Sequence, residues 1–410
     1  MTEIVFRLKR HLTSFQIMIL GFAGVILLGA LVLMLPIATV QRVWTPFHEA
    51  LFTSTSAVCV TGLVVQDTGS YWSAFGQTVI LLLIQIGGLG VITGAVTFLM
   101  LAGRNITLKE RSAMQDAISA PAVGGIVRLT RFILKGTFLV ELLGALALLP
   151  VFCRDYGLRG VWMSVFHSVS AFCNAGFDIL GRTDSLYPSL TAYAADPLVN
   201  IVIMLLIIVG GIGFLTWDDV CTHGLHLRRY RMQSKVILSA TALLITIPAF
   251  LFYLTDFADL PVGERILASL FQSVTPRTAG YNTVDLTEMT DASQAVTILL
   301  MLTGGAPGST AGGMKVTTLA VLIANAVAAF RRREDPQLFH RRLEHSAVRN
   351  AAAILLLYLG LTPQLGVLSQ SILILLMYFG RVGGLTLIYA AFSGHDLTYA
   401  RYPQEKITVG

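Results

Sequence analysis

Charged residues are scarce in this chain of 410 residues, at 13%, whereas 55% belong to the hydrophobic set. The mean hydropathy of +0.72 lies far above the range of soluble domains and excludes that class. Cysteines are few as well, and the four of them, Cys59, Cys153, Cys173 and Cys221, form no C-x-x-C pair. We therefore expect neither a disulfide framework nor a zinc site.

The chain also lacks a phosphate-binding loop. The glycines around residues 308–315 are not followed by Gly-Lys-Ser/Thr, the pattern that cradles phosphate, so ATP hydrolysis by this chain is not expected. Asp218 and Asp219 resemble a catalytic pair only superficially, because they end an apolar segment beside Trp217, where solvated acids are ordinary. We expect no enzymatic activity and no cofactor in this chain.

What the sequence has instead is six apolar runs that are long enough to cross a bilayer. About 30 Å of hydrocarbon requires roughly 20 helical residues. The runs are continuous rather than alternating, which predicts an all-α integral membrane protein in contact with lipid. They cover residues 17–36, 79–101, 132–152, 199–215, 236–254 and 372–392.

Lys and Arg occur in clusters, separated by segments with few positive charges. The positive-inside rule places such clusters in cytoplasmic loops. We therefore expect a multi-pass protein of the plasma membrane with its N- and C-termini in the cytoplasm. Nucleic-acid binding is the rival interpretation, and the rule accounts for the basic loops without it. The clusters cover residues 7–10, 104–135, 228–235, 331–349 and 401–406.

Three segments on the expected outer side resemble one another: residues 52–62, 166–176 and 271–280. Each begins with Phe, is rich in small polar side chains and ends at a glycine. Each is too short and too polar to cross the bilayer, which predicts a re-entrant half-helix followed by an extended loop. Non-helical backbone at membrane depth is tolerated only where protein buries it or where it lines a water-filled cavity. A cavity lined by such loops is a pore.

These loops have the residue types that a cation filter needs. Backbone carbonyls arranged in a ring replace the hydration shell of a passing ion, and glycine readily reaches the backbone angles that turn consecutive carbonyls toward one axis. The half-helices would point their negative C-terminal ends at the ion. We predict that a cation binds at backbone carbonyls of Val60, Thr61, Gly62, Asn174, Ala175, Gly176, Thr278, Ala279 and Gly280.

A glycine-rich stretch interrupts the inner helix of the third unit. Residues 304–313 contain five glycines and Pro307. Relative to Ala, each Gly costs about 1 kcal/mol in a helix and an interior Pro roughly 3 kcal/mol. The pattern predicts a break, and a kink that merely eases helix packing is the alternative.

The glycine segments, the run Gly304–Thr318, the segment Gly380-Arg-Val-Gly383 and the tail Tyr402–Lys406 resemble the Trk/Ktr/HKT superfamily of potassium transporters. The closest type is the KtrB-type translocating subunit. The resemblance implies four helix–pore loop–helix repeats around a pseudo-fourfold pore, with one filter glycine per repeat. It also implies potassium uptake, a homodimer and a cytosolic ring of nucleotide-binding regulatory subunits. Sodium stimulation and the preference between K⁺ and Na⁺ stay open.

By the same resemblance, the break at residues 304–313 is an intramembrane loop that gates the pore. The implied gate residues are Gly304, Gly305, Gly308, Gly312, Gly313, Lys315 and Arg381. Arg381 is expected to face the pore, whereas Lys315 is expected either to raise a barrier there or to extend toward the membrane surface.

The expected organisation is repeat one at 1–103, repeat two at 104–222 with a basic cytoplasmic linker, repeat three at 223–333 and a truncated repeat four at 334–410. The apolar stretch 351–361 gives roughly 17 Å of helix, too little to cross the membrane. No fourth Phe-to-Gly segment follows. Judged from the family pattern, roughly 40 residues with the fourth pore loop are absent. A non-conducting membrane subunit or scaffold is therefore the alternative function.

Overall fold

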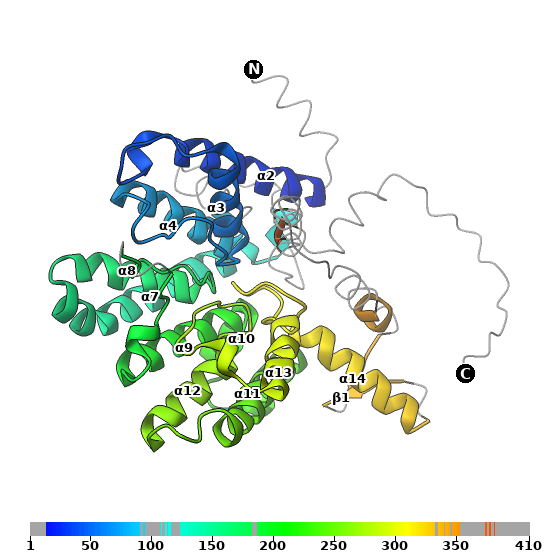
Figure 1. The fold of residues 1–410 in the computed structure, drawn as a ribbon. Helices are drawn as coiled ribbons and strands as arrows, with labels where there is room; N and C mark the ends of the chain where they lie inside the picture. The colour runs from blue at the N-terminus through cyan, green and yellow to red at the C-terminus, as the bar shows by residue number, and fades with distance from the viewer. Residues whose placement is uncertain are drawn as a thin grey trace.

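The protein is almost wholly helical in the computed structural model (Figure 1). Within the described part, strands are limited to β1 (Gln337–Leu338) and β2 (Arg341–Arg342), which pair antiparallel. The predicted all-α class is confirmed. The structure describes residues 14–90, 93–94, 108, 111–112, 114–115, 124–182, 187–332, 335–339, 341–344, 347–352, 374, 377–378 and 381.

The first group of helices comprises α2 (Ser14–Leu33), α3 (Phe47–Cys59) and α4 (Ala74–Leu89), drawn in blue in Figure 1. The half-length helix α3 ends at Val60, which has a left-handed backbone. At the start of α4, Ser73 Oγ accepts the N–H of Gly76 at 3.3 Å, which satisfies a backbone donor of the first turn. The helix ends before Gly90, whose φ is 88°.

The second group comprises α7 (Ile126–Tyr156), α8 (Arg159–Phe172), α9 (Pro197–Gly211) and α10 (Phe214–His223). α8 is half-length like α3 and is followed by the second glycine segment. α9 begins after Asp196, whose carboxylate accepts the N–H of Val199 at 3.0 Å. Pro197 takes the first helical position, where its missing N–H would have no partner within the helix.

The prediction of one continuous helix over residues 199–215 is wrong. α9 and α10 are bent by 98° at a short break, and Gly213 in that break has φ 87°. Hydropathy stays high across the break, so the apolar run hides it. In the expected run 79–101, α4 ends at Leu89. Thr93 and Gly94 are again helical, and residues 91–92 and 95–101 lie outside the described residues.

The third group comprises α11 (Met232–Thr255), α12 (Val262–Val274), α13 (Asp291–Leu302) and α14 (Val316–Phe330). Residues 303–315, here called the interrupted segment, are not helical, and the predicted break in this inner helix is thus present. Figure 1 shows the three groups beside one another, with α14 extending away from them. Short 3₁₀ turns also occur: η1 (Pro36–Ala38), η2 (Thr191–Tyr193), η3 (Leu227–Arg229) and η4 (Leu286–Glu288).

Three helices in the described part, α2, α7 and α11, are long and apolar enough to cross a membrane, and the bent pair α9–α10 adds a fourth if it counts as one span. On α7, one stripe of leucines is more than half exposed, as expected for a helix that faces lipid: Leu139, Leu142, Leu143 and Leu146. The expected span 372–392 lies almost wholly outside the described residues.

The first two groups share matching contacts between each long helix and its half-length helix. Ser54 Oγ on α3 donates to the carbonyl of Ile26 on α2 at 2.7 Å. Ser168 Oγ on α8 donates to the carbonyl of Glu141 on α7 at 2.6 Å. The two serines lie at the same distance from their loop glycines, eight residues ahead of each.

A glycine one turn further along the long helix allows this close approach in both groups. A Cβ added at Gly29 would lie 2.5 Å from Ser54 Oγ, and one added at Gly144 would lie 2.5 Å from Ser168 Oγ. The inner helices match as well, since a Cβ at Gly87 or Gly210 would lie 2.0 Å from a carbonyl of the half-length helix. Groups one and two therefore share the same set of contacts between long helix, half-length helix and inner helix. The exact repeat boundaries and a pseudo-fourfold arrangement stay predictions.

Candidate functional site

The three glycine loops, residues 60–62, 174–176 and 278–280, have one backbone pattern. Their glycines all lie in the left-handed region, with φ of 79° at Gly62, 68° at Gly176 and 84° at Gly280. The residue two positions earlier is left-handed as well. These residues are Val60 (φ 58°), Asn174 (φ 58°) and Thr278 (φ 71°).

Left-handed backbone at a non-glycine residue is uncommon and costs energy, most of all for a β-branched residue such as Val60 or Thr278. Three independent segments share it at matching positions. Since the middle residue of each loop is not left-handed, handedness alternates along the loop. Such alternation turns successive carbonyls in a way that a continuous helix or strand does not.

The loops also touch one another in cyclic order. A Cβ added at Gly62 would lie 2.6 Å from the carbonyl oxygen of Ala175, and one added at Gly176 would lie 2.4 Å from that of Ala279. One added at Gly280 would lie 3.6 Å from Gly176 Cα and 3.9 Å from the carbonyl oxygen of Thr61. Gly62 and Gly176 thus each face the residue before the glycine of the next loop, and Gly280 lies near both other loops. Side chains larger than hydrogen do not fit at the first two positions, and all nine predicted filter residues lie in these contacting loops.

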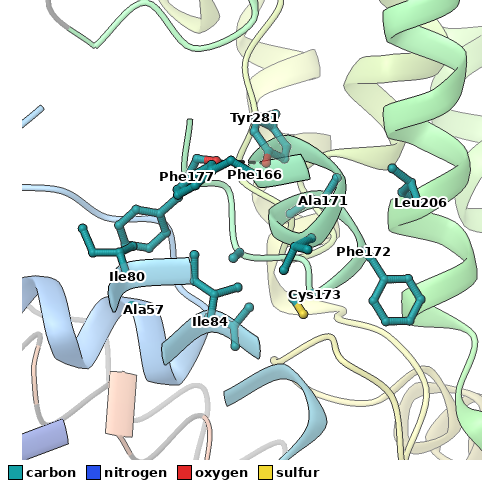
Figure 2. Packing of buried hydrophobic residues seen from close by; sticks show 14 of the residues in the cluster. Ala57, Ile80, Ile84, Phe166, Ala171, Phe172, Cys173, Phe177, Leu206 and Tyr281 are labelled. Atoms are coloured by element: carbon teal, nitrogen blue, oxygen red, sulfur yellow. Dashed lines mark hydrogen bonds between the residues drawn. The ribbon is translucent and has the colours of Figure 1, made fainter. Parts of the chain in front are cut away.

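Hydrogen bonds fix the second and third loops in the same way. Ser170 Oγ donates to the carbonyl of Phe177 at 2.7 Å, and Thr275 Oγ1 donates to the carbonyl of Tyr281 at 2.6 Å. The Tyr281 hydroxyl crosses to the Phe177 carbonyl at 3.0 Å (Figure 2). In the first loop, the matching Ser56 Oγ is buried without a hydrogen-bond partner.

Backbone hydrogen bonds join the two ends of the interrupted segment to each other and join its middle to the break between α9 and α10. The N–H of Gly304 donates to the carbonyl of Met314 at 2.8 Å. The N–H of Ala306 donates to the carbonyl of Gly211 at 2.8 Å. Phe214 N–H donates to the carbonyl of Gly308, also at 2.8 Å. The segment therefore fills the gap that the bend between α9 and α10 leaves open.

The interrupted segment also contacts two of the glycine loops directly. Asn174 Nδ2 donates to Thr310 Oγ1 at 2.9 Å, and the N–H of Gly312 donates to Thr278 Oγ1 at 3.3 Å. Both loop residues belong to the left-handed positions described above. A movement of the interrupted segment would therefore change or break hydrogen bonds to these two loops.

Two positively charged side chains, those of Lys315 and Arg381, donate hydrogen bonds to the interrupted segment. Lys315 Nζ donates to the carbonyl of Ala311 at 2.7 Å, so this side chain folds back onto the segment instead of extending to the membrane surface. Arg381 donates to the carbonyl of Thr310 at 2.7 Å and to that of Gly88 at 3.0 Å. All seven expected gate residues lie in this contact region or beside it. Of the family segment 380–383, the structure describes only Arg381.

Sequence reasoning missed several residues that join these parts, above all Thr310 and the side chain of Asn174. Asn tolerates the left-handed backbone better than most residues, which was a signal for its position but not for its partner. Within the described residues, no group of three or more His, Cys, Asp and Glu side chains is placed to hold a metal ion. Ion ligands at this site would be backbone oxygens.

Half-length helices, left-handed glycine loops that contact one another and a broken inner helix together make up this site. The TrkH family model, described as a cation transport protein, matches residues 13–362. The chain therefore belongs to the TrkH family of cation transport proteins, which are ion transporters rather than enzymes.

Relatives of full length support the assignment. The chain is 34% identical to the potassium/sodium uptake protein NtpJ of Enterococcus hirae, with 100% of both chains covered. It is 35% identical to the Ktr system potassium uptake protein B of Bacillus subtilis, with 96% of both covered. The crystal structure of the potassium transporter TrkH from Vibrio parahaemolyticus shares the fold, with a TM-score of 0.69 at 19% identity, covering 91% of this chain and 83% of that one.

The comparison with NtpJ extends over 458 aligned positions, which exceeds the 410 residues of this chain by 48. The family match ends at residue 362, next to Pro363. At least 48 positions of the alignment with NtpJ therefore have no residue of this chain opposite them. The segment 353–373 lies outside the described residues, and the absence of a fourth pore loop there stays a prediction.

Proposed function

We propose that this protein takes up potassium across the plasma membrane as the pore-forming subunit of a Ktr/Trk-type system. The glycine loops carry the proposal, since three left-handed glycines that face neighbouring carbonyls in cyclic order suit a ring of backbone oxygens that replaces the hydration shell of K⁺. Relatives whose names state potassium uptake support the choice of ion. K⁺ is then the substrate, and Na⁺ is either a second substrate or a stimulating ion.

In this proposal the interrupted segment is the gate. Its hydrogen bonds to Asn174 and Thr278 and its bond from Arg381 support this role, because Thr310 of the segment contacts both Arg381 and the second glycine loop. A homodimer, a cytosolic nucleotide-binding regulatory ring and cytoplasmic termini complete the proposal. They rest on the family resemblance and on the positive-inside rule.

The second candidate is a non-conducting membrane subunit. The alignment positions of NtpJ that have no counterpart in this chain support it, because a filter built from three loops, as the sequence predicts, would lack one wall. The two candidates differ in ion flux and agree in regulatory-ring binding. A non-conducting subunit would copurify with the ring and show no rubidium flux.

Growth and uptake test the proposal. Expression in a cell that lacks potassium import should restore growth at low potassium, and purified protein in vesicles should take up rubidium. Gly176→Ala should abolish both, because the added methyl group would lie 2.4 Å from a carbonyl oxygen at a left-handed position.

Gly24→Ala is the matched control, since this α2 glycine has no atom within 4 Å of its added Cβ. It should behave as the unmodified chain does. Equal activity of the two variants would contradict the role of the loops, and loss of growth and flux in the unmodified chain would favour the non-conducting subunit.

A further inference from the structure

An arginine without an acidic partner is buried behind the third glycine loop. Arg277 is 7% exposed, and its Nε is buried with no hydrogen-bond partner. Among the described residues, the structure has no ion pair for it. A buried donor without an acceptor costs free energy, and more so when it is charged. The guanidinium therefore needs a partner beyond the protein atoms around it.

A small cavity of about 10 Å³ lies beside this arginine. It is lined by Asn174 of the second loop, Arg277 of the third, Ile207 of α9, Thr241 of α11 and Gly305 of the interrupted segment. One water molecule requires roughly 10–15 Å³ by this measure, together with two to four polar partners. The cavity therefore has room for one water molecule at the meeting point of two glycine loops.

Asn174 supplies an unused acceptor in the same cavity. The single hydroxyl hydrogen of Thr310 is donated to the carbonyl of Phe172 at 2.9 Å, so Thr310 Oγ1 must accept from Asn174. This fixes the amide orientation, with Nδ2 toward Thr310 at 2.9 Å. Asn174 Oδ1 is buried with no partner. The two residues that have an unused donor and an unused acceptor, Arg277 and Asn174, thus both line one water-sized space.

We propose that a single buried water accepts from Arg277 Nε, donates to Asn174 Oδ1 and so holds the second and third glycine loops at a fixed spacing. Thr241 offers its hydroxyl as a third partner. A halide fits the site less well, because it cannot donate to the amide oxygen and is larger than water. The effect of the bridge on ion selectivity rests on the proposed function, whereas its existence does not.

A density map of the full-length protein near 2 Å resolution tests the bridge without any transport measurement. We expect one peak within about 2.7–3.2 Å of both Arg277 Nε and Asn174 Oδ1, with no anomalous signal after exchange of chloride for bromide. An empty cavity would overturn the proposal. A bromide peak would overturn it too, in favour of an anion site.

Transport then tests the consequence. Arg277→Lys keeps the positive charge and removes the Nε–H, and it should lower the discrimination of K⁺ over Na⁺ about five-fold, the factor that one hydrogen bond corresponds to. Rubidium flux should stay measurable. Arg265→Lys is the control, because Arg265 lies in the first turn of α12 and donates to the Tyr253 carbonyl near the C-terminal end of α11. Its selectivity should not change.

Arg277→Gln separates the bridge from simple charge. If Arg277→Lys keeps full selectivity and Arg277→Gln loses it, charge alone matters at this position and the bridging role is overturned. If both lose it and the map peak is absent in Arg277→Lys, the water positions the loops. A protein that shows the water but transports no ions would contradict the proposed function alone.

Discussion

The guanidinium of Arg381 donates to the carbonyl oxygen of Thr310 at 2.7 Å, and its other end reaches the carbonyls of Gly87 and Gly88. The arginine thereby ties the interrupted segment of the third group to the last turn of α4 in the first. Three carbonyls share this one cation.

Replacing Arg381 tests whether this tie restrains ion flow. Hydrogen bonds from a charged group contribute about 1.5–3 kcal/mol, so Arg381→Gln should free the interrupted segment and raise rubidium flux about ten-fold or more in vesicles. Arg331→Gln, at the exposed C-terminal end of α14, removes a charge without touching the segment and should leave flux unchanged. Identical flux in both variants would speak against the tie.

Shortening the interrupted segment should also raise rubidium flux, as Arg381→Gln should. Deleting Gly308 and Ser309 removes the acceptor for Phe214 N–H and empties part of the gap between α9 and α10. We expect higher rubidium flux than in the unmodified protein. Deleting the exposed pair Leu225 and His226 is the control for a two-residue deletion. A shortened segment with unchanged flux would show that it does not gate.

The matching serines of groups one and two should be equally important for stability. Ser54→Ala and Ser168→Ala each remove one hydrogen bond between neighbouring helices, and such bonds in membranes contribute about 0.6 kcal/mol on average. Both should lower the free energy of unfolding in detergent by a similar amount. Ser239→Ala, whose hydroxyl bonds only within α11, should change it less. Unequal effects of the first two would argue against a shared plan.

The C-terminal end of α11 should lose stability in acid. Burial acts to raise the pKa of Asp256, but hydrogen bonds from Ser293, Thr255 and Thr290 together hold that pKa below its ordinary value. A carboxylate with a lowered folded pKa stabilises the protein above the unfolded pKa of about 3.9, and this contribution is lost as the pH falls through the folded pKa. Asp256→Asn should therefore melt lower at pH 7, with a difference that shrinks below about pH 4. A difference that does not depend on pH would contradict this.

The sequence predicted the positions of the glycine loops and the break after α13, because each has a local signature. Five glycines and Pro307 within ten residues disfavour a continuous helix. The sequence did not predict the bend at Gly213, since the apolar run continues on both sides and the glycines at 210, 211 and 213 also suit close packing within an unbroken helix.

The local sequence pattern also could not predict contacts between segments that are far apart in the chain. Asn174 and Thr310 are 136 residues apart, and Arg381 reaches Gly88 over 293 residues. Nothing near Thr310 in the chain marks it as the acceptor for an amide. Such partners depend on which side chains the packed helices bring together, and the same holds for the cavity between Arg277 and Asn174.

The central claim is that the three glycine loops surround one axis and replace the hydration shell of a monovalent cation. Anomalous diffraction from crystals grown in rubidium tests it most directly. The account predicts a rubidium peak between the carbonyls of residues 60–62, 174–176 and 278–280. Rubidium bound elsewhere in a protein that transports it, with no density between these loops, would contradict the account.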